Sequence, residues 1–341
     1  GAKNSQLVAQ FWWVRNQKPD SDMAALTGAF NDARGTKAAN QTRGMNFHYK
    51  QGWDDGAVEL KAGMVVVDDD FMNSCYADVL SNSCFGTLPT EVGTPLAASL
   101  DNHGAVPSYP VAAPGIVVSF GGNHPFSSRI GLYHGGPGPD ASNNHGFDWD
   151  RLSAAGVVIF AESAWRTTVT GRENVLHAGA SYHTGTFDNF SRINAGYGTA
   201  TVRGLFGAYL FDDLTLSCAP DGKPRLGLFW HVGASPQLDR SVVSTYADLG
   251  LSWFGPLPAR PNDTVGFGFS WTRFGTAYRR CAGPSVLAAS ETVWEATYRA
   301  ELTGHWFLQA EWQWLGNPSD PSGSGHRRDA MVVGLRSGVA F

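Results

Sequence analysis

Apolar and polar side chains alternate along most of this chain with a period of two residues. In residues 305–315, for example, tryptophans and Leu308 occupy one alternate set, and Gln309, Glu311 and Gln313 occupy the other. This period predicts β-strands, because successive side chains of a strand point to opposite faces. We predict fourteen strands, at residues 5–15, 42–52, 57–67, 115–122, 128–134, 155–168, 174–186, 201–216, 224–234, 243–254, 264–275, 290–302, 305–315 and 329–341.

The more apolar set of each predicted strand is expected to form one continuous outer surface. Charged residues make up 16% of the chain, yet we expect this surface to be free of them. An Arg or Lys that faces the middle of a bilayer costs about 2–4 kcal/mol, so an uncharged surface suits contact with lipid. The last predicted strand ends at Phe341, a pattern typical of transmembrane β-barrels of bacterial outer membranes.

The connections between the predicted strands alternate in length. The short ones are 53–56, 123–127, 169–173, 217–223, 255–263 and 303–304. The long ones are 16–41, 68–114, 135–154, 187–200, 276–289 and 316–328, and 235–242 is an exception to the alternation. Short turns in the periplasm and long loops outside are the pattern of outer-membrane barrels.

Aromatic residues gather at the ends of the predicted strands. Two girdles result, with Trp53, Trp165, Trp253, Trp306 and Phe341 at the periplasmic ends and Trp13, Trp271 and Trp314 near the outer ends. Aromatic rings favour the two interfaces of a membrane. We therefore prefer a lipid-facing wall to a soluble core with scattered tryptophans.

Composition supports a single barrel and limits the alternatives. The chain has 341 residues, 41 glycines and 42 aromatic side chains (12 Trp, 20 Phe and 10 Tyr), which suits many strands and turns. It contains no apolar run long enough for a membrane helix, so a membrane-spanning chain of this sequence must be a barrel. The net charge of −5 argues against nucleic acid as a partner. Because the chain begins with Gly1, we interpret it as processed or trimmed.

The polar alternate sets are predicted to face a wet lumen. The candidate lining residues are Glu59, Lys61, Glu162, Arg166, His177, Arg203, His231, Asp248, Glu295, Arg299, Gln309, Glu311, Gln313 and Arg336. Guanidinium donors and carboxylate acceptors can exchange hydrogen bonds with sugar hydroxyls during passage. The alternative is that these charges only pair with one another across strands. For the constriction we favour Glu162, Arg166, Glu295, Arg299, Glu311 and Arg336.

The long connection 68–114 is predicted to fold into the lumen and to narrow it, because connections of this length are usually functional. Its Asp68–Asp70 triplet lacks the spacing of a calcium loop. Cys75 and Cys84 lie in this one loop, and we expect a disulfide between them in an oxidising compartment. Elimination would then pair Cys218 with Cys281, but the predicted topology places these two at opposite ends of the barrel. That conflict stays open.

Catalysis finds no support in the sequence. The chain shows no nucleophile elbow, phosphate loop or paired-carboxylate signature, and its histidines lack the spacing of metal ligands. We therefore expect no enzyme activity, no metal and no cofactor.

Several stretches resemble recurring stretches of the carbohydrate-selective porins of the OprB family, in the same order and from about residue 42 to the end. They are LKAGMVVVDDDFMNS (60–74), PSYPVAAPG (107–115), GPLPARPNDTVGFGF (255–269), ETVWEATYRAEL (291–302), WFLQAEWQWLGNP (306–318) and DAMVVGLRSGVAF (329–341). The resemblance implies a sixteen-stranded outer-membrane barrel through which monosaccharides and similar sugars diffuse passively.

This sequence also departs from the family. A Gly-Asp-Trp-Gly-Gly-like start and the first strands are not visible, which fits the count of fourteen strands and a trimmed N-terminus. A closed fourteen-stranded barrel is the other alternative. Ala310 stands where the family has Pro, and Met64 where it has Gln, so no sugar contact is carried over to Met64.

The sequence therefore predicts an all-β, antiparallel transmembrane barrel in the bacterial outer membrane, surrounded by outer-membrane lipids and lipopolysaccharide. We expect one domain over 1–341 that acts as a diffusion channel for small sugars, as a monomer or a homotrimer. Two other classes stay open. One is a plugged barrel with a structural or assembly role in a partner complex, and the other is a soluble all-β enzyme.

Overall fold

Each alternating segment of the sequence forms a β-strand in the computed structural model. The strands are β1 (Ser5–Val14), β2 (Gln41–Trp53), β3 (Val58–Val65), β4 (Ala113–Phe120), β5 (Phe126–His134), β6 (Val157–Val169), β7 (Arg172–Asp188), β8 (Thr201–Cys218), β9 (Pro224–Ala234), β10 (Val243–Phe254), β11 (Thr264–Phe274), β12 (Ser290–Thr303), β13 (Trp306–Gly316) and β14 (Ala330–Val339). Their ends agree with the predicted bounds to within two residues.

The structure describes residues 4–15, 27, 29–31, 33, 41–90, 106–122, 124–138, 145–149, 151–282, 288–319 and 328–340. Phe341 and the middle of the predicted loop 68–114 lie outside the described residues.

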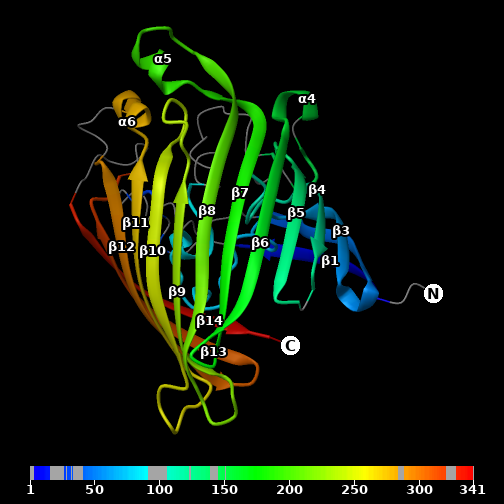
Figure 1. Cartoon of the computed structure of the whole chain (residues 1–341). Coiled ribbons are helices and arrows are strands. Elements are labelled where there is room, and N and C mark those ends of the chain that lie inside the picture. Colours follow the sequence, from blue (N-terminus) through cyan, green and yellow to red (C-terminus); the bar gives the residue numbers. More distant parts are fainter. Residues whose placement is uncertain are drawn as a thin grey trace.

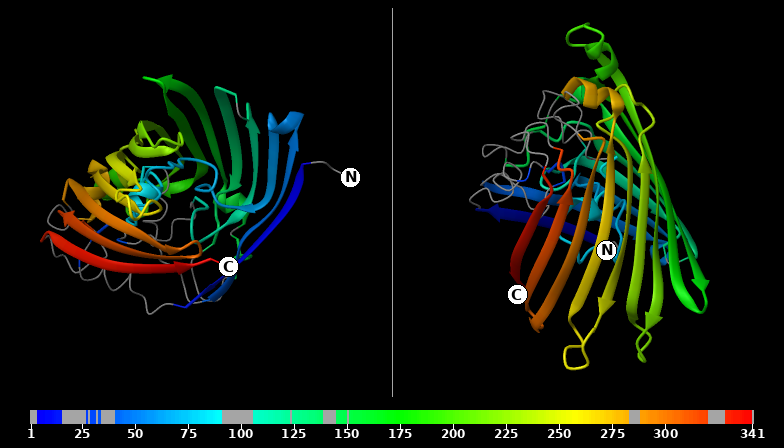
Figure 2. Two further views of the ribbon diagram at one scale, coloured as in Figure 1. Left: turned by 90° about the horizontal axis from the view of Figure 1, so that it is seen from below. Right: turned by 90° about the vertical axis from the view of Figure 1, so that its left-hand side faces the viewer.

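The strands form a single antiparallel sheet in which every strand pairs with its neighbours in the sequence. Figure 2 shows the sheet curling around the part of the chain that follows β3, which is drawn in cyan. Over the ranges given above, no backbone ladder joins β1 to β14. The fold is thus all-β and antiparallel, as the alternation predicts.

The two ends of the sheet differ. Figure 1 shows tight turns at the lower end and longer connections at the upper end. The upper connections contain the short helices α4 (Leu152–Ala155), α5 (Phe190–Asn194) and α6 (Thr276–Ala282), and the one-turn helix η1 (Asp54–Gly56) lies in a lower turn. We call these ends the loop end and the turn end. Short turns belong to the periplasmic side of outer-membrane barrels, which places the loop end outside.

No helix in the described part of the chain is long and apolar enough to cross a membrane.

The convex side of the sheet carries large exposed apolar side chains. On β10, Leu249, Leu251 and Trp253 are exposed, whereas Tyr246 and Asp248 between them and the loop end are buried on the concave side. The tryptophans predicted at the periplasmic ends, Trp53, Trp165, Trp253 and Trp306, are all exposed. This is the arrangement that lipid on the outside requires.

The convex side is not wholly free of charge, and that expectation was wrong at Asp212, Arg273 and Arg203, of which Arg203 is described with the channel lining below. Asp212 lies on it because its neighbours Phe211 and Asp213 are buried on the concave side. The amide of Asn174 can donate to both carboxylate oxygens of Asp212, at 3.0 and 3.1 Å, which lowers the cost of its position. Arg273 lies at the loop end of β11, in the same alternate set as Phe267 and Trp271.

A charge introduced halfway along the convex side should destabilise the sheet. Leu249 is 52% exposed and lies opposite Trp230 and Phe269 in the register. Leu249→Arg is expected to lower the free energy of unfolding by about 2–4 kcal/mol, because the guanidinium would face the bilayer midplane. Urea unfolding in phospholipid vesicles measures this change.

Val169→Arg provides the matched control, because Val169 is the last residue of β6 and lies at the turn end. There the same charge should cost only about 0–1 kcal/mol. Equal costs at the two positions would contradict a lipid-facing wall.

Candidate channel lining

Most of the predicted lining residues lie on the concave side, as the alternation requires. Buried there are Lys61, Glu162, His231, Asp248, Glu295, Gln309, Glu311 and Gln313. His177, Glu59, Arg299 and Arg336 lie on the same side and are partly exposed. The sequence therefore predicted the side of the sheet correctly for these residues.

Two predicted lining residues lie elsewhere. Arg166 is exposed at the turn end, where it donates to the carbonyl of Gly122 and lies 3.9 Å from Glu173. Arg203 is exposed and lies opposite Thr186, beyond a register shift that follows His183. Gly204 next to it has a φ of +83°, which glycine adopts without strain. The shift turns Arg203 to the convex side, so its prediction as a lining residue was wrong.

The concave side is covered by the chain that follows β3. Residues 66–90, which include the single-turn helix α2 (Ser83–Gly86), run along it, and we call them the inner segment. Its Phe71, Tyr76, Leu80 and Phe85 are buried in one apolar cluster with side chains of the wall. The ring of Phe71 lies 5.3 Å from that of Phe160, and the ring of Phe85 lies 6.3 Å from that of Phe229.

Glycine in the wall lets the inner segment approach closely. A Cβ atom at Gly227 of β9 would lie 2.5 Å from the ring of Tyr76, which is closer than real atoms approach. The abundance of glycine in this sequence thus has a specific use here, because the wall needs recesses for aromatic side chains.

Three carboxylates of the wall accept backbone N–H groups of the inner segment. Glu162 accepts from Met72 N at 3.0 Å, and Asp213 accepts from Cys75 N at 2.8 Å and from Ser74 Oγ at 2.5 Å. Glu295 accepts from Ser81 N at 2.7 Å and from Asn82 N at 2.9 Å. The carboxylates thereby satisfy donors that would otherwise be buried without partners.

Neutral groups of the wall complete this attachment. Gln309 Nε2 donates to the carbonyl of Val79 at 2.7 Å, and the amide of Asn82 donates to Gln313 at 3.1 Å. The hydroxyl of Tyr246 donates to the carbonyl of Cys84 at 2.6 Å. Inner-segment residues from Met72 to Cys84 are thus bound to the wall at both donors and acceptors.

A second stretch of chain binds the wall at Glu291, near the loop end. This carboxylate is fully buried and accepts from the backbone N–H groups of Phe30, Asn31 and Ser319 at 2.8–3.0 Å. The sequence analysis did not single out Glu291 or Asp213. Each of them is an acid in the polar alternate set of a strand, and this pattern could have identified them. Glu291 lies in the same set of β12 as the predicted Glu295.

Charges also fix the start of the inner segment. Lys61 Nζ lies 2.8 Å from Asp70 Oδ2, and Arg129 donates to the backbone carbonyl of Asp70. Asp68 accepts from Tyr109 N at 3.2 Å. The pKa of Asp68 is raised from 3.8 to about 6, mainly by burial and to a smaller extent by the neighbouring Asp69, against the hydrogen bond from Tyr109 N that lowers it.

A cluster of half-exposed groups remains on the concave side towards the turn end, and we call it the Arg–Phe cluster. The guanidinium carbon of Arg299 lies 3.8 Å from the ring centroid of Phe307, and that of Arg336 lies 5.6 Å from it. Arg299 also pairs with Glu301, at 2.7 Å between Nε and Oε1. A guanidinium over an aromatic face is attracted to the ring. The side chains of Arg299 and Arg336 are therefore held near Phe307 although they stay partly exposed.

The predicted disulfide between Cys75 and Cys84 does not form. Both thiols are free, and so are those of Cys218 and Cys281. Cys84 Sγ lies 3.0 Å from Ser270 Oγ of β11, whereas the backbone of Cys75 is bound to Asp213 of β8. The inner segment runs across the wall, which separates two cysteines that are near in the sequence.

In the part of the chain that the structure describes, no group of three His, Cys, Asp or Glu side chains could hold a metal ion.

An antiparallel sheet with an apolar convex side, aromatic strand ends and chain packed on its concave side defines an outer-membrane β-barrel of the porin class. The chain belongs to the carbohydrate-selective porin family OprB, which its residues 15–341 match. This assignment also places it in the outer membrane, in a family of porins.

Individual relatives are more distant. The chain is 24% identical over 227 residues to QuiX of Acinetobacter baylyi, a protein provisionally assigned as a porin, and the match covers 65% of this chain and 48% of QuiX. The chain thus spans about half the length of that curated relative.

Among solved structures, the fold is similar to the high-pH structure of Pseudomonas putida OprB, with a TM-score of 0.77, 20% identity, and coverage of 92% of this chain and 77% of the other. It is also similar to the outer-membrane channel DcaP of Acinetobacter baumannii, with a TM-score of 0.54 and 11% identity over 91% of this chain and 79% of the other.

Removing the charge of Glu295 should loosen the inner segment. Glu295→Gln keeps the shape but turns one of the two accepting oxygens into a donor, and hydrogen bonds to charged groups contribute about 1.5–3 kcal/mol. We expect the amide hydrogens of Ser81 and Asn82 to exchange about tenfold faster or more, as measured by hydrogen exchange with mass spectrometry.

Glu301→Gln is the control for this measurement, because Glu301 lies on the same strand and pairs with Arg299 instead of the inner segment. Circular dichroism verifies that both variants keep the sheet. If exchange at Ser81 and Asn82 stayed at the wild-type rate in Glu295→Gln, the attachment through this carboxylate would be refuted.

Asp68 should make the stability depend on pH. Because its folded pKa of about 6 lies above the usual 3.8, its contribution is complete below about pH 4 and is lost as the pH rises through about 6. We expect Asp68→Asn to lose less stability than the wild type between pH 4 and pH 7 in urea unfolding. Asp221→Asn, at a 57% exposed side chain of a turn, should keep the wild-type dependence. Identical pH profiles for Asp68→Asn and the wild type would argue against this assignment.

Proposed function

We propose that this protein is a passive diffusion channel for carbohydrates and similar small polar solutes. The observation that carries the proposal is the Arg–Phe cluster beside the inner segment. Arg299, Arg336 and Glu301 offer donors and an acceptor to sugar hydroxyls, and the ring of Phe307 offers an apolar face for a pyranose. Membership of a family of carbohydrate-selective porins supports the same substrate class.

The inner segment is the proposed selective element. It is attached to the wall at Glu162, Asp213 and Glu295, so its position is fixed rather than induced by the solute. A fixed constriction selects by width and by the polar groups that border it, and flux then follows the concentration gradient. No energy source is needed for such transport.

One observation favours a second candidate, a plugged barrel with a structural role. Residues Phe71 to Leu88 of the inner segment pack in an apolar cluster that includes Val293, Leu315 and Val332 of the opposite wall. A segment that reaches several parts of the wall could block passage instead of narrowing it.

Swelling of sugar-loaded liposomes distinguishes the two candidates. For the channel we expect swelling with glucose, slower swelling with a trisaccharide, and none in liposomes without protein. A plugged barrel would give the protein-free rate with every solute, and that result would overturn the proposal.

Arg299→Ala tests the Arg–Phe cluster itself. Its side chain is 33% exposed on the concave side, so its loss should change single-channel conductance by tens of percent and shift ion preference towards cations. Planar-bilayer recording measures both quantities. Lys223→Ala, at an 82% exposed side chain of a turn, should leave them unchanged. Wild-type values for Arg299→Ala would place this residue away from the path.

A further inference from the structure

Exposed arginines gather at the loop end of the sheet. They share exposure and a position at or beyond the outer strand ends, and they are Arg15, Arg151, Arg192, Arg203, Arg273, Arg280 and Arg328. Over the described ranges none of them forms an ion pair. At the turn end, by contrast, Arg166, Lys223 and Arg260 lie within 4 Å of Glu173, Asp221 and Asp263. In the described residues, exposed arginines without an ion pair are thus more numerous at the loop end than at the turn end, where Arg172 and Arg225 are of this kind.

Two of these arginines, Arg203 and Arg273, lie on the convex side and would face lipid. Arg273 continues the exposed alternate set of β11 directly beyond Trp271, while Thr272 and Phe274 on either side of it are buried. Its main chain is fixed, because Ser244 Oγ donates to its carbonyl at 3.1 Å. Arg273 thus lies two residues beyond Trp271 towards the loop end, outside the aromatic residues at the strand ends.

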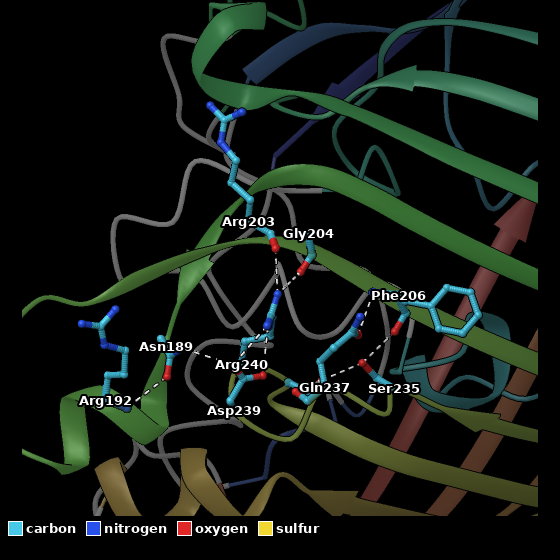
Figure 3. Close-up of polar contacts among 10 residues, drawn as sticks. Asn189, Arg192, Arg203, Gly204, Phe206, Ser235, Gln237, Asp239 and Arg240 are labelled. Carbon is cyan, nitrogen blue, oxygen red and sulfur yellow. Dashed lines mark hydrogen bonds and ion pairs between the residues drawn. The ribbon is translucent and has the colours of Figure 1, made fainter.

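Arg203 lies on β8, three residues beyond the exposed Phe206 and five beyond Ala208, which the register aligns with Arg273. Figure 3 shows its side chain leaving the strand on the side away from Arg240. Arg240 donates to the carbonyls of Arg203 and Gly204, both at 2.7 Å, and pairs with Asp239 at 3.0 Å. Arg240 therefore holds the backbone, and Asp239 is occupied by Arg240 rather than by Arg203.

The positions of Arg203 and Arg273 indicate which chemical group these two side chains could bind. Arginine's planar fork of donors matches phosphate oxygens, and aromatic rows mark the level where headgroups begin. β8 and β11 are three strand spacings apart, about 14 Å at roughly 4.8 Å per strand. The register aligns Arg273 with Ala208, and Arg203 lies five residues further towards the loop end, so the two residues are about 20 Å apart in the sheet. Two fixed guanidiniums at that separation can contact phosphates of neighbouring headgroups.

We propose that Arg203 and Arg273 bind phosphate groups of lipopolysaccharide in the outer leaflet. The loop end faces outside, where the lipid is a phosphorylated glycolipid, and the remaining exposed arginines extend the positive charge over this end. In the described residues, the exposed acids at this end include Asp148 and Asp329, and Asp188 and Asp239 are partly exposed. This site is separate from the Arg–Phe cluster and does not depend on the solute that passes.

Native mass spectrometry of the detergent-solubilised protein with purified lipid A tests the proposal. EDTA is included so that divalent cations cannot bridge acidic groups to phosphate. The wild type should retain lipid A, and the double variant Arg203→Ala/Arg273→Ala should bind it about tenfold more weakly or worse. The matched control is Arg172→Ala/Arg225→Ala, which removes two exposed arginines at the turn ends of β7 and β9 and should bind as the wild type does.

Two further lipids identify the group that is recognised. Dephosphorylated lipid A and phosphatidylglycerol should both bind the wild type weakly, and unchanged swelling rates verify that the double variant is folded. The proposal is overturned if the double variant binds lipid A like the wild type, or if the control variant weakens equally. It is also overturned if dephosphorylated lipid A binds as well, or if phosphatidylglycerol does, since binding would then be apolar or generally anionic.

Discussion

Irregular chain can lie inside a barrel only if its backbone N–H and C=O groups find partners there, and this requirement shapes the whole concave side. A strand ladder satisfies its own backbone groups, but the inner segment has no ladder. Glu162, Asp213 and Glu295 replace it by accepting the N–H groups of Met72, Cys75, Ser81 and Asn82. The acids and the segment depend on each other, because a buried carboxylate without donors would be as costly as the unpaired donors.

This mutual dependence divides the polar residues of the concave side into two groups. Residues such as Glu295 and Gln309 are buried and already bound to the inner segment, so they act on a solute only through the position of that segment. Arg299, Glu301 and Arg336 remain partly exposed and can contact a solute directly. The width of a passage and the chemistry that borders it are therefore set by different residues of the same strands.

The period-two pattern predicts the strands, their order and the side on which most side chains lie, because one buried or lipid-facing side constrains every second position. It cannot show what covers the concave side, so Glu162 and Glu295 were placed correctly but interpreted as lining rather than as attachment points.

Asp213 was missed because Asp212 precedes it, and both alternate sets of β8 then contain an acid. Arg203 was misplaced because a register shift reverses the alternation at that point. The Cys75–Cys84 disulfide failed because sequence spacing does not reveal the path of a loop.

The two sides of each strand also fix its register jointly. On β12, Trp294 is exposed to the outside, while the adjacent Glu295 is fully buried against Ser81 and Asn82. A slip of one residue would turn Glu295 towards lipid and Trp294 towards the inner segment. The slip would break the attachment of the inner segment and would also place a charge on the apolar convex side. Both effects disfavour the slipped register. Lipid outside and bound chain inside thus specify one pairing of β12 with β13, in which Glu295 lies opposite Gln313 and Trp294 opposite Trp314.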